Sequence, residues 1–378
     1  MLNIIKPLIK FFFFLSILSC GENNNKSQNT NRSFLPNASG ENNEMLIVMD
    51  SSAFRSVVGR ELVNTYGSFV KGLPQPEKKF DLRYIRPRSF NNILKHAKNI
   101  IVAFTLDGKG IDSDILRKNF NETSLQRIEN DTSLYYFTRR DQYAKGQIIL
   151  YLFGKSEKLL LGKLQKNKSL ILKYFEDEVK KRVDREIFRK KEDNIESKIY
   201  EDHSVKLKIP FGYDLAKNLK GSEGNFFWLR QLEPDFEKNI FVYYEDYDEN
   251  ELADFSYVFN DDDRSIENVR KKIANKFLTD SENKRVFMTL QDIFPIEYQE
   301  IVFKNFSGVE ATGLWKLSDL SAGGPFKSYV IYDQRNKRAY YIEGYVFAPG
   351  QKKRDLMQEI TSILNTFEIW YLFWKEIR

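Results

Sequence analysis

Blocks of apolar residues, each with its own periodicity, divide the chain into predicted strands and helices. The first block is Met45–Met49, a continuous apolar run that predicts a buried strand. Asp50 and Ser51 follow it with side chains suited to capping the helix that comes next. The other elements predicted here are a helix with Phe54, Val57, Val58, Leu62, Tyr66 and Phe69 on one face, a strand at 80–85, a helix with Phe90, Ile93, Leu94 and Ala97 on one face, strands at 99–106 and 147–153, and a long helix at 168–191. This β-α-β-α-β order is typical of an α/β unit.

Strands dominate the second part of the chain. They are predicted at 205–210, 226–232, 240–244, 286–290, 309–317, 328–333 and 339–347, with helices at 265–278 and 353–367. The charged stretch 190–202 marks the expected domain boundary. We therefore predict an α+β protein of two α/β-type domains. They are an N-terminal domain at 45–195, with the β-α-β-α-β unit and the long helix, and a C-terminal domain at 203–370, with a mostly antiparallel sheet flanked by helices.

The start of the chain has the pattern of an export signal. Lys6 and Lys10 precede the apolar run Phe11–Leu18, and small Ser19 comes before Cys20. This pattern predicts a signal peptide at 1–19, with Cys20 as the lipidated first residue of a bacterial lipoprotein. The apolar run is too short for a transmembrane helix, which needs roughly 20 residues. Ordinary secretion with an incidental cysteine and an uncleaved anchor are the alternatives.

The segment between this signal and the first strand is almost entirely polar. Residues 21–44 are rich in Asn, Ser and Gly, so they cannot bury enough apolar surface to offset the entropy of ordering. We expect residues 20–44 to form a disordered tether attached through the lipid on Cys20. A coil of this length has an r.m.s. reach of roughly 25–30 Å.

Composition excludes several classes of function. The chain has 378 residues, with 59 basic and 53 acidic side chains and a net charge of +6. That small excess lacks the concentrated basic face of nucleic-acid-binding proteins, so no nucleic-acid partner is expected. Cys20 is the only cysteine and there are two histidines, which makes a zinc enzyme unexpected. A hydrophobic content of 42% is sufficient for a packed core.

No motif predicts a catalytic, cofactor or metal site. His96 and His203 are interpreted as surface or boundary residues, and no nucleophile elbow or zinc-binding helix motif is present. Gly108-Lys109-Gly110 lacks the flanking residues of a phosphate-binding loop. The acidic run 245–251 has the spacing of a calcium loop but lacks its glycine, and 261–263 precedes a helix, so both are read as solvated loop and cap.

One glycine-rich corner is a candidate binding surface. Two adjacent glycines and a proline between strands fix an unusual backbone path, and aromatic residues lie close by in the sequence. The residues are Trp315, Gly323, Gly324, Pro325, Phe326 and Tyr329. A buried aromatic corner of the sheet is the other interpretation. The aromatic tail 370–374 is likewise either an interface with a membrane or partner, or part of the core.

Several segments resemble a known family. They come in one order along the chain: Glu44–Asp50, Gly72–Pro76, Gly313–Lys316, Gly323–Phe326 and Gly344–Pro349. The order, over nearly all of the chain, resembles a lipoprotein family of Bacteroidetes described as domain of unknown function family 4837. The C-terminal part is also similar, by analogy in element order alone, to the PsbP fold. The family resemblance implies a lipid-anchored envelope protein and supplies no reaction.

Together these observations predict where the protein is located in the cell, and they leave its molecular activity open. We expect a non-enzymatic binding or scaffold lipoprotein of the cell envelope, held by its lipid at the periplasmic face of the outer membrane. A protein of the envelope is its expected partner. The alternative is an envelope hydrolase that uses carboxylates on glycan or peptide.

Overall fold

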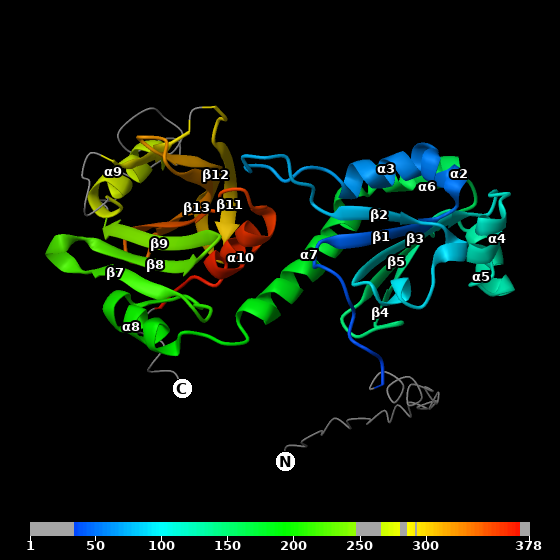
Figure 1. Ribbon diagram of the computed structural model, residues 1–378, viewed down its shortest axis with the longest axis horizontal. Coiled ribbons are helices and arrows are strands. Elements are labelled where there is room, and N and C mark those ends of the chain that lie inside the picture. The colour runs from blue at the N-terminus through cyan, green and yellow to red at the C-terminus, as the bar shows by residue number, and fades with distance from the viewer. Residues whose placement is uncertain (1–33, 247–265, 280–285, 292, 371–378) are drawn as a thin grey trace, which may run out of the picture.

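The structure is a computed structural model that describes residues 34–246, 266–279, 286–291 and 293–370. The predicted signal, Cys20, most of the acidic run 245–251, all of 261–263 and the tail beyond Trp370 lie outside these residues. Two units lie side by side, each built on its own sheet, and the long helix α7 (Lys168–Ile187) runs from one toward the other (Figure 1).

The N-terminal unit contains a mostly parallel sheet. Its strand order is β2-β1-β3-β5-β4, and only β4 runs antiparallel to its neighbour. The strands are β1 (Glu44–Met49), β2 (Asp81–Ile85), β3 (Asn99–Thr105), β4 (Tyr136–Arg140) and β5 (Ile148–Gly154). Strands β1, β3 and β5 are buried on both faces, which explains their continuous apolar runs.

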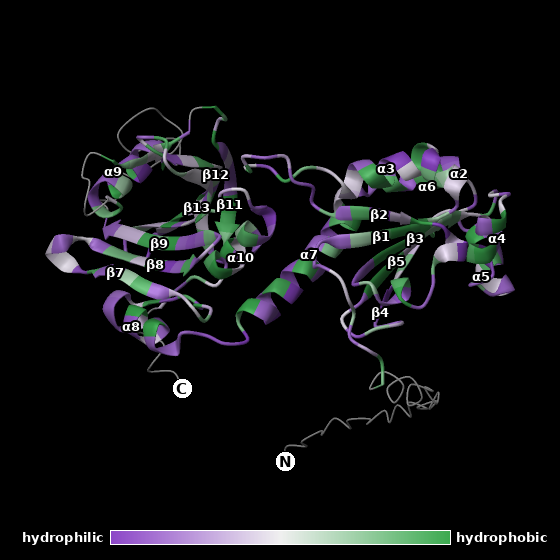
Figure 2. Cartoon of the chain, in the orientation of Figure 1, coloured by the Kyte–Doolittle hydropathy of each residue, from purple (hydrophilic) through white to green (hydrophobic). Residues whose placement is uncertain are grey.

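Helices cover both faces of this sheet. They are α2 (Ser51–Arg55), α3 (Val57–Tyr66), α4 (Ile111–Arg117), α5 (Glu122–Asn130) and α6 (Glu157–Lys166), together with α7. Apolar residues of α3, α6 and α7 form one core with the sheet, and α4 and α5 contribute to the core on the opposite face. Figure 2 shows these apolar residues on the strands and on the helix faces turned toward them.

Local capping explains two departures from the predicted helices. The helix predicted after β1 is two helices, because Ser56 leaves the helical conformation and its side chain caps α3. Asp50 caps α2, as predicted. The helix predicted around Phe90 is wrong: the segment forms only 3₁₀ turns at Pro87–Ser89 and Leu94–His96, and the side chain of Asn91 accepts from the amide of Leu94.

The C-terminal unit is built on a large antiparallel sheet of order β10-β12-β13-β14-β9-β8-β7, and β11 also pairs with β12. Its strands are β7 (Asp214–Leu219), β8 (Asn225–Glu233), β9 (Phe236–Asp246), β10 (Met288–Leu290), β11 (Glu297–Phe303), β12 (Phe306–Leu317), β13 (Gly323–Asp333) and β14 (Arg338–Phe347). Short strands β6 (Val205–Lys206) and β15 (Glu368–Ile369) pair with each other. Neither β7 nor β11 is predicted from the sequence.

Helices lie on both faces of this sheet as well. Helix α9 (Ile266–Phe277) packs on one face, and α8 (Asp193–His203) and α10 (Arg354–Leu364) pack on the other. Helix α8 occupies the stretch predicted as the domain boundary. The α+β class is confirmed, with an α/β unit followed by an antiparallel half-barrel sheet. Within the described residues no helix is long and apolar enough to span a bilayer.

The predicted tether is shorter than expected, because part of it belongs to the N-terminal unit. Residues 36–39 run along this unit through backbone hydrogen bonds, from Ala38 to the carbonyl of Lys145 (2.8 Å) and from Ser39 to that of His96 (2.9 Å). Backbone groups form these bonds whatever the side chains, which is why a polar composition did not reveal them.

His203 is buried, contrary to its interpretation as a surface or boundary residue. Its Nε2 donates to the side-chain oxygen of Asn218 (2.6 Å), and Nδ1 accepts from the hydroxyl of Tyr244 (3.1 Å). With both ring nitrogens satisfied, the neutral ring is stable in the core. Burial holds the pKa of His203 below its ordinary value of 6.5.

This histidine predicts a loss of stability in mild acid. The unfolded chain takes up a proton near pH 6.5, whereas the folded chain takes it up only at lower pH. The free energy of unfolding is therefore highest above pH 6.5 and decreases as the pH falls through this window. Urea unfolding at about pH 8 and about pH 5.5 measures the difference. His203→Gln should remove most of it, and an unchanged difference in that variant would show that another group is responsible.

Candidate functional site: the cleft between the units

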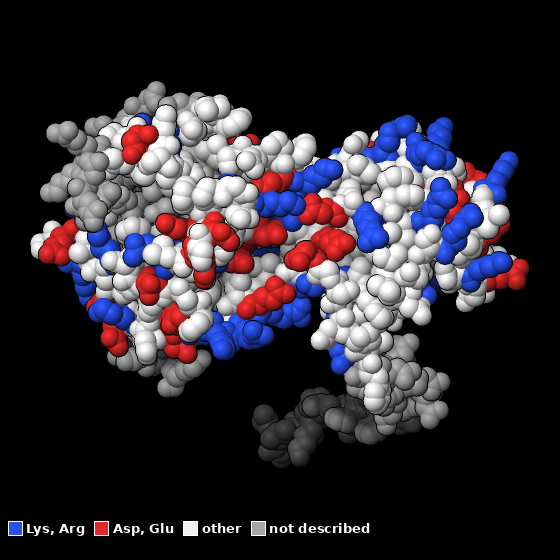
Figure 3. Space-filling model, in the orientation of Figure 1, with Lys and Arg blue, Asp and Glu red and all other residues white. Residues whose placement is uncertain are grey.

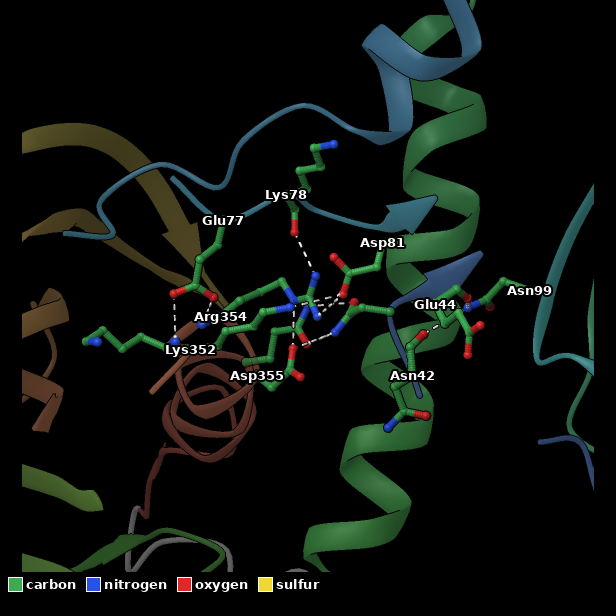
Figure 4. Close-up of polar contacts among 12 residues, drawn as sticks. Asn42, Glu44, Glu77, Lys78, Asp81, Asn99, Lys352, Arg354 and Asp355 are labelled. Atoms are coloured by element: carbon green, nitrogen blue, oxygen red, sulfur yellow. Dashed lines mark hydrogen bonds and ion pairs between the residues drawn. The ribbon is translucent and has the colours of Figure 1, made fainter. Parts of the chain in front are cut away.

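An arm of the N-terminal unit reaches the C-terminal unit and caps one of its helices. The arm is residues 68–79, held together by a bridge between Phe69 and Lys78. The carboxylate of Glu77 accepts from the backbone amides of Lys353 (2.7 Å) and Arg354 (3.0 Å), where α10 begins (Figure 4). Lys353 itself provides no side-chain cap. Glu77 therefore satisfies amides that the helix leaves unpaired and places negative charge at its positive end.

Arg354 forms the second part of this junction. Its buried guanidinium donates to the carbonyl of Lys78 (2.8 Å) and to Asp81 (3.2 Å) in the N-terminal unit, and to Asp355 (2.7 Å) beside it on α10. The side chain thus joins α10 to the arm and to the start of β2. Such charge-assisted hydrogen bonds are roughly twice as strong as neutral ones.

Asn43 completes the network, immediately before β1. Its side-chain amide donates to Asp355 (2.8 Å) and Gln358 (2.8 Å), and its oxygen accepts from Gln358 (3.2 Å). We call Asn43, Glu77, Asp81, Arg354, Asp355 and Gln358 the inter-unit clamp. Because these side chains hydrogen-bond across the junction, where Asn43, Glu77 and Arg354 are buried, they hold the two units together.

A cavity of about 520 Å³ lies beside the clamp, and we call it the inter-unit cleft. Its lining comes from the arm, from α7, from β11, β12 and β13, and from α10. The volume is within the range of about 300–1,000 Å³ that is usual for ligand sites. Figure 3 shows acidic and basic side chains of both units gathered along this junction.

One wall of the cleft is a face of the C-terminal sheet. Alternate residues of neighbouring strands point to the same face, and the register aligns Glu297 with Thr312 and Thr312 with Lys327. Gln299 aligns with Glu310 in the same way. Three adjacent strands therefore present a row of polar and charged side chains to the cleft.

Three lysine–glutamate pairs line the cleft. Two join the walls of the cleft to the arm: Lys71 to Glu297 (3.0 Å) and Lys79 to Glu176 (2.8 Å). The third lies on the sheet, between Lys327 and Glu310 (2.8 Å). The apolar residues between them are Val70, Leu73, Phe80, Val179, Val183, Pro325 and Met357. These pairs are at least partly exposed, so exchange of partners with a charged ligand costs little.

The candidate binding surface predicted from the sequence is mostly a buried corner. Trp315, Phe326 and Tyr329 are each less than 5% exposed, and Trp315 donates to the carbonyl of Val346 (3.2 Å). Gly324 is also buried, and a side chain there would overlap that same carbonyl, so the position requires glycine. Gly323 is half-buried. These residues expose no aromatic patch. Of the six, only Pro325 lines the cleft.

The other predicted features lie away from the cleft. His96 is half-buried in a 3₁₀ turn of the N-terminal unit. Trp370 is the described end of the aromatic tail. The ammonium group of Lys206 lies over the Trp370 ring, 3.5 Å from the ring centroid. Among the described residues, no three His, Cys, Asp or Glu side chains are grouped closely enough to hold a metal ion.

Sequence reasoning missed the residues that build the cleft. Glu77 and the amide of Arg354 that it caps are separated by 277 positions. No local pattern reveals a helix cap supplied from so far away. The weak signal available was Lys353-Arg354 at the start of a predicted helix, where a cap from Ser, Thr, Asp or Asn is the usual arrangement and none is present.

Two family models match the chain, one for each unit. Residues 192–366 match the domain of unknown function DUF4837, and residues 38–188 match the domain of unknown function DUF8532. The resemblance to the first family is thus confirmed for the C-terminal unit only. Extending it over nearly all of the chain was wrong, since the N-terminal unit matches a different model.

Comparisons with characterised proteins yield little. No curated protein matches the sequence. Among solved structures, a Ran-binding protein of Saccharomyces cerevisiae, Mog1p, is 11% identical, with a TM-score of 0.28, over 44% of this chain and 90% of that one. LpqN of Mycobacterium tuberculosis, described as involved in cell envelope biogenesis, is 10% identical, with a TM-score of 0.26, over 44% and 83%.

These scores establish neither a shared fold nor a shared activity, and they do not test the PsbP analogy. The chain joins a unit that matches DUF8532 to a unit that matches DUF4837, and both are described as domains of unknown function.

Proposed function

We propose that this protein is a non-enzymatic lipoprotein of the cell envelope that binds an extended segment of a partner protein in the inter-unit cleft. The single observation that carries the binding role is the cavity of about 520 Å³ between two units that the clamp holds together. The lipid on Cys20 and a place at the periplasmic face of the outer membrane remain proposals, based on the order of residues at the start of the chain.

The lining favours polypeptide over a small apolar ligand. The lysine–glutamate pairs offer both signs of charge, and Gln299, Gln358 and Thr312 add groups that can hydrogen-bond to peptide amides. Apolar side chains lie between these polar groups. A peptide with charged and apolar side chains matches that alternation, since each of its groups would find a suitable neighbour.

The alternative expectation, a hydrolase that uses carboxylates, gains no specific support from the cleft. Glu176, Glu297 and Glu310 are the carboxylates that line it, and each is paired with a lysine. The cleft therefore favours binding over hydrolysis.

Site-specific photocrosslinking in intact cells tests this proposal. A photoreactive amino acid at Gln299, which lines the cleft, should give one discrete crosslinked species. The same amino acid at Leu232, which is exposed on β8 and does not line the cleft, is the matched control. Equal crosslinking at the two positions, or none at Gln299, would contradict a binding role for the cleft.

A further inference from the structure

A second cavity, of about 440 Å³, lies at the end of α7 that is nearer the C-terminal unit. It is lined by Asn37, Lys145, Gly146, Arg182, Arg185, Glu186 and Arg189, and we call it the basic cavity. Arg182, Arg185 and Arg189 are spaced three and four residues apart, so they project from the same side of α7 and its continuation. Four basic residues and one carboxylate give this cavity a strong excess of positive charge.

Arg182 lies at the base of the cavity and is 5% exposed. Its guanidinium donates to the side-chain oxygen of Asn99 (2.7 Å) and to the carbonyl of Lys98 (3.2 Å). Both acceptors are neutral, so the charge of this buried cation is not balanced by an ion pair within the described residues. Burial lowers the pKa of Arg182 to about 10, and the nearby carboxylates of Glu178 and Glu186 offset only part of this effect.

The two arginines at the mouth are available to a ligand. Within the part of the chain that the structure describes, Arg185 and Arg189 form neither a hydrogen bond nor an ion pair. The one carboxylate of the cavity, Glu186, accepts instead from the side chain of Asn42 (2.9 Å). The helix dipole favours cations near the C-terminal end of a helix, and this accounts for the exposed Arg185 and Arg189 at that end of α7. It does not account for a buried Arg182 well inside the helix.

We propose that the basic cavity binds the phosphate of an anionic phospholipid headgroup. A phosphate matches the planar, forked donors of arginine and would add negative charge beside Arg182, which forms no direct ion pair within the described residues. The lipid source rests on the proposed membrane anchor. Asn37 lines the cavity, and the described residues before β1 lie on this side of the unit, beside β4 and away from α3 (Figure 1).

The distance to a membrane fits this assignment. Thirteen residues, 21–33, separate Cys20 from the first described residue. Thirteen residues span at most about 47 Å when fully extended. A lipid on Cys20 would therefore keep the basic cavity within reach of the bilayer surface. Binding of a headgroup there would fix the orientation of the protein on the membrane.

Vesicle binding by the chain from residue 20 onward, with Cys20→Ser, tests the proposal without any contribution from the lipid anchor or the predicted signal peptide. We expect this chain to bind vesicles of phosphatidylglycerol more tightly than vesicles of phosphatidylcholine, and added salt to weaken the difference. Arg185→Gln with Arg189→Gln should weaken binding to phosphatidylglycerol by about thirtyfold. The matched control, Lys173→Gln with Lys198→Gln, removes two exposed lysines of α7 and α8 and should leave binding nearly unchanged.

Three results would overturn the proposal. One is equal binding to the two kinds of vesicle, and another is an equal loss in the arginine and lysine variants, which would indicate only non-specific attraction. The third is binding of inorganic phosphate at the same arginines without preference for anionic vesicles, which would make the cavity a site for free phosphate. None of these results depends on whether Cys20 carries a lipid, so failure here is distinct from failure of the proposed anchor.

Discussion

Glu343→Gln is expected to lower the free energy of unfolding of the C-terminal unit by about 3–5 kcal/mol, the usual effect of removing one partner from a buried ion pair. Glu343 and Arg270 are both at most 1% exposed, and Arg270 donates to both carboxylate oxygens of Glu343, at 2.8 and 2.7 Å. Tyr341 donates to Glu343 as well (2.7 Å). The neutral amide would leave Arg270 charged, buried and unbalanced between α9 and the sheet.

A double variant provides the control for this prediction. Arg270→Met with Glu343→Leu replaces the pair by apolar side chains of similar size, so no buried charge remains. It should be more stable than Glu343→Gln alone in chemical denaturation. A loss below about 1 kcal/mol for Glu343→Gln would mean that the pair reaches solvent or another partner.

Glu77→Ala should destabilise the junction of the two units by about 2–4 kcal/mol, because it removes a helix cap and leaves two amides of α10 without acceptors. Glu77 is 8% exposed, so water cannot readily replace the carboxylate. Hydrogen exchange should accelerate at the amides of Lys353 and Arg354, which Glu77 accepts from. Denaturation and amide exchange together measure the effect.

Glu176→Ala is the matched control for Glu77→Ala. It removes another glutamate that contacts the arm, but its pair with Lys79 is partly exposed and is worth about 0–1 kcal/mol. Equal effects of the two variants would contradict the assignment of Glu77 as the cap of α10.

Strand and helix periodicity predicted much of this fold, because buried parallel strands leave continuous apolar runs. The run at Met45–Met49 corresponds to β1, and the helix predicted at 265–278 corresponds to α9. Elements with mixed exposure were missed: β11, with Val302 76% exposed, has no apolar alternation to recognise. The failed helix around Phe90 shows the opposite error, since apolar spacing alone does not outweigh side chains that hydrogen-bond to the local backbone.

The candidate site was less accessible to sequence reasoning than the fold. The residues chosen from the sequence, Trp315 and Phe326 among them, combine aromatic side chains with unusual backbone, and that combination describes a packed corner as well as a binding surface. The cleft instead depends on contacts between units, such as those of Glu77 and Arg354, which lie far apart in the chain. Spacing along a sequence carries no information about such pairs.

The most direct test of the binding role is crosslinking at Gln299 in a chain whose cleft is filled. Thr361 lies on α10 and lines the cleft, so Thr361→Trp places a large side chain in the space proposed for the ligand. If the inter-unit cleft is the binding site, the species crosslinked at Gln299 disappears in this variant while the protein remains folded. The same species at undiminished yield in the folded variant would contradict the account.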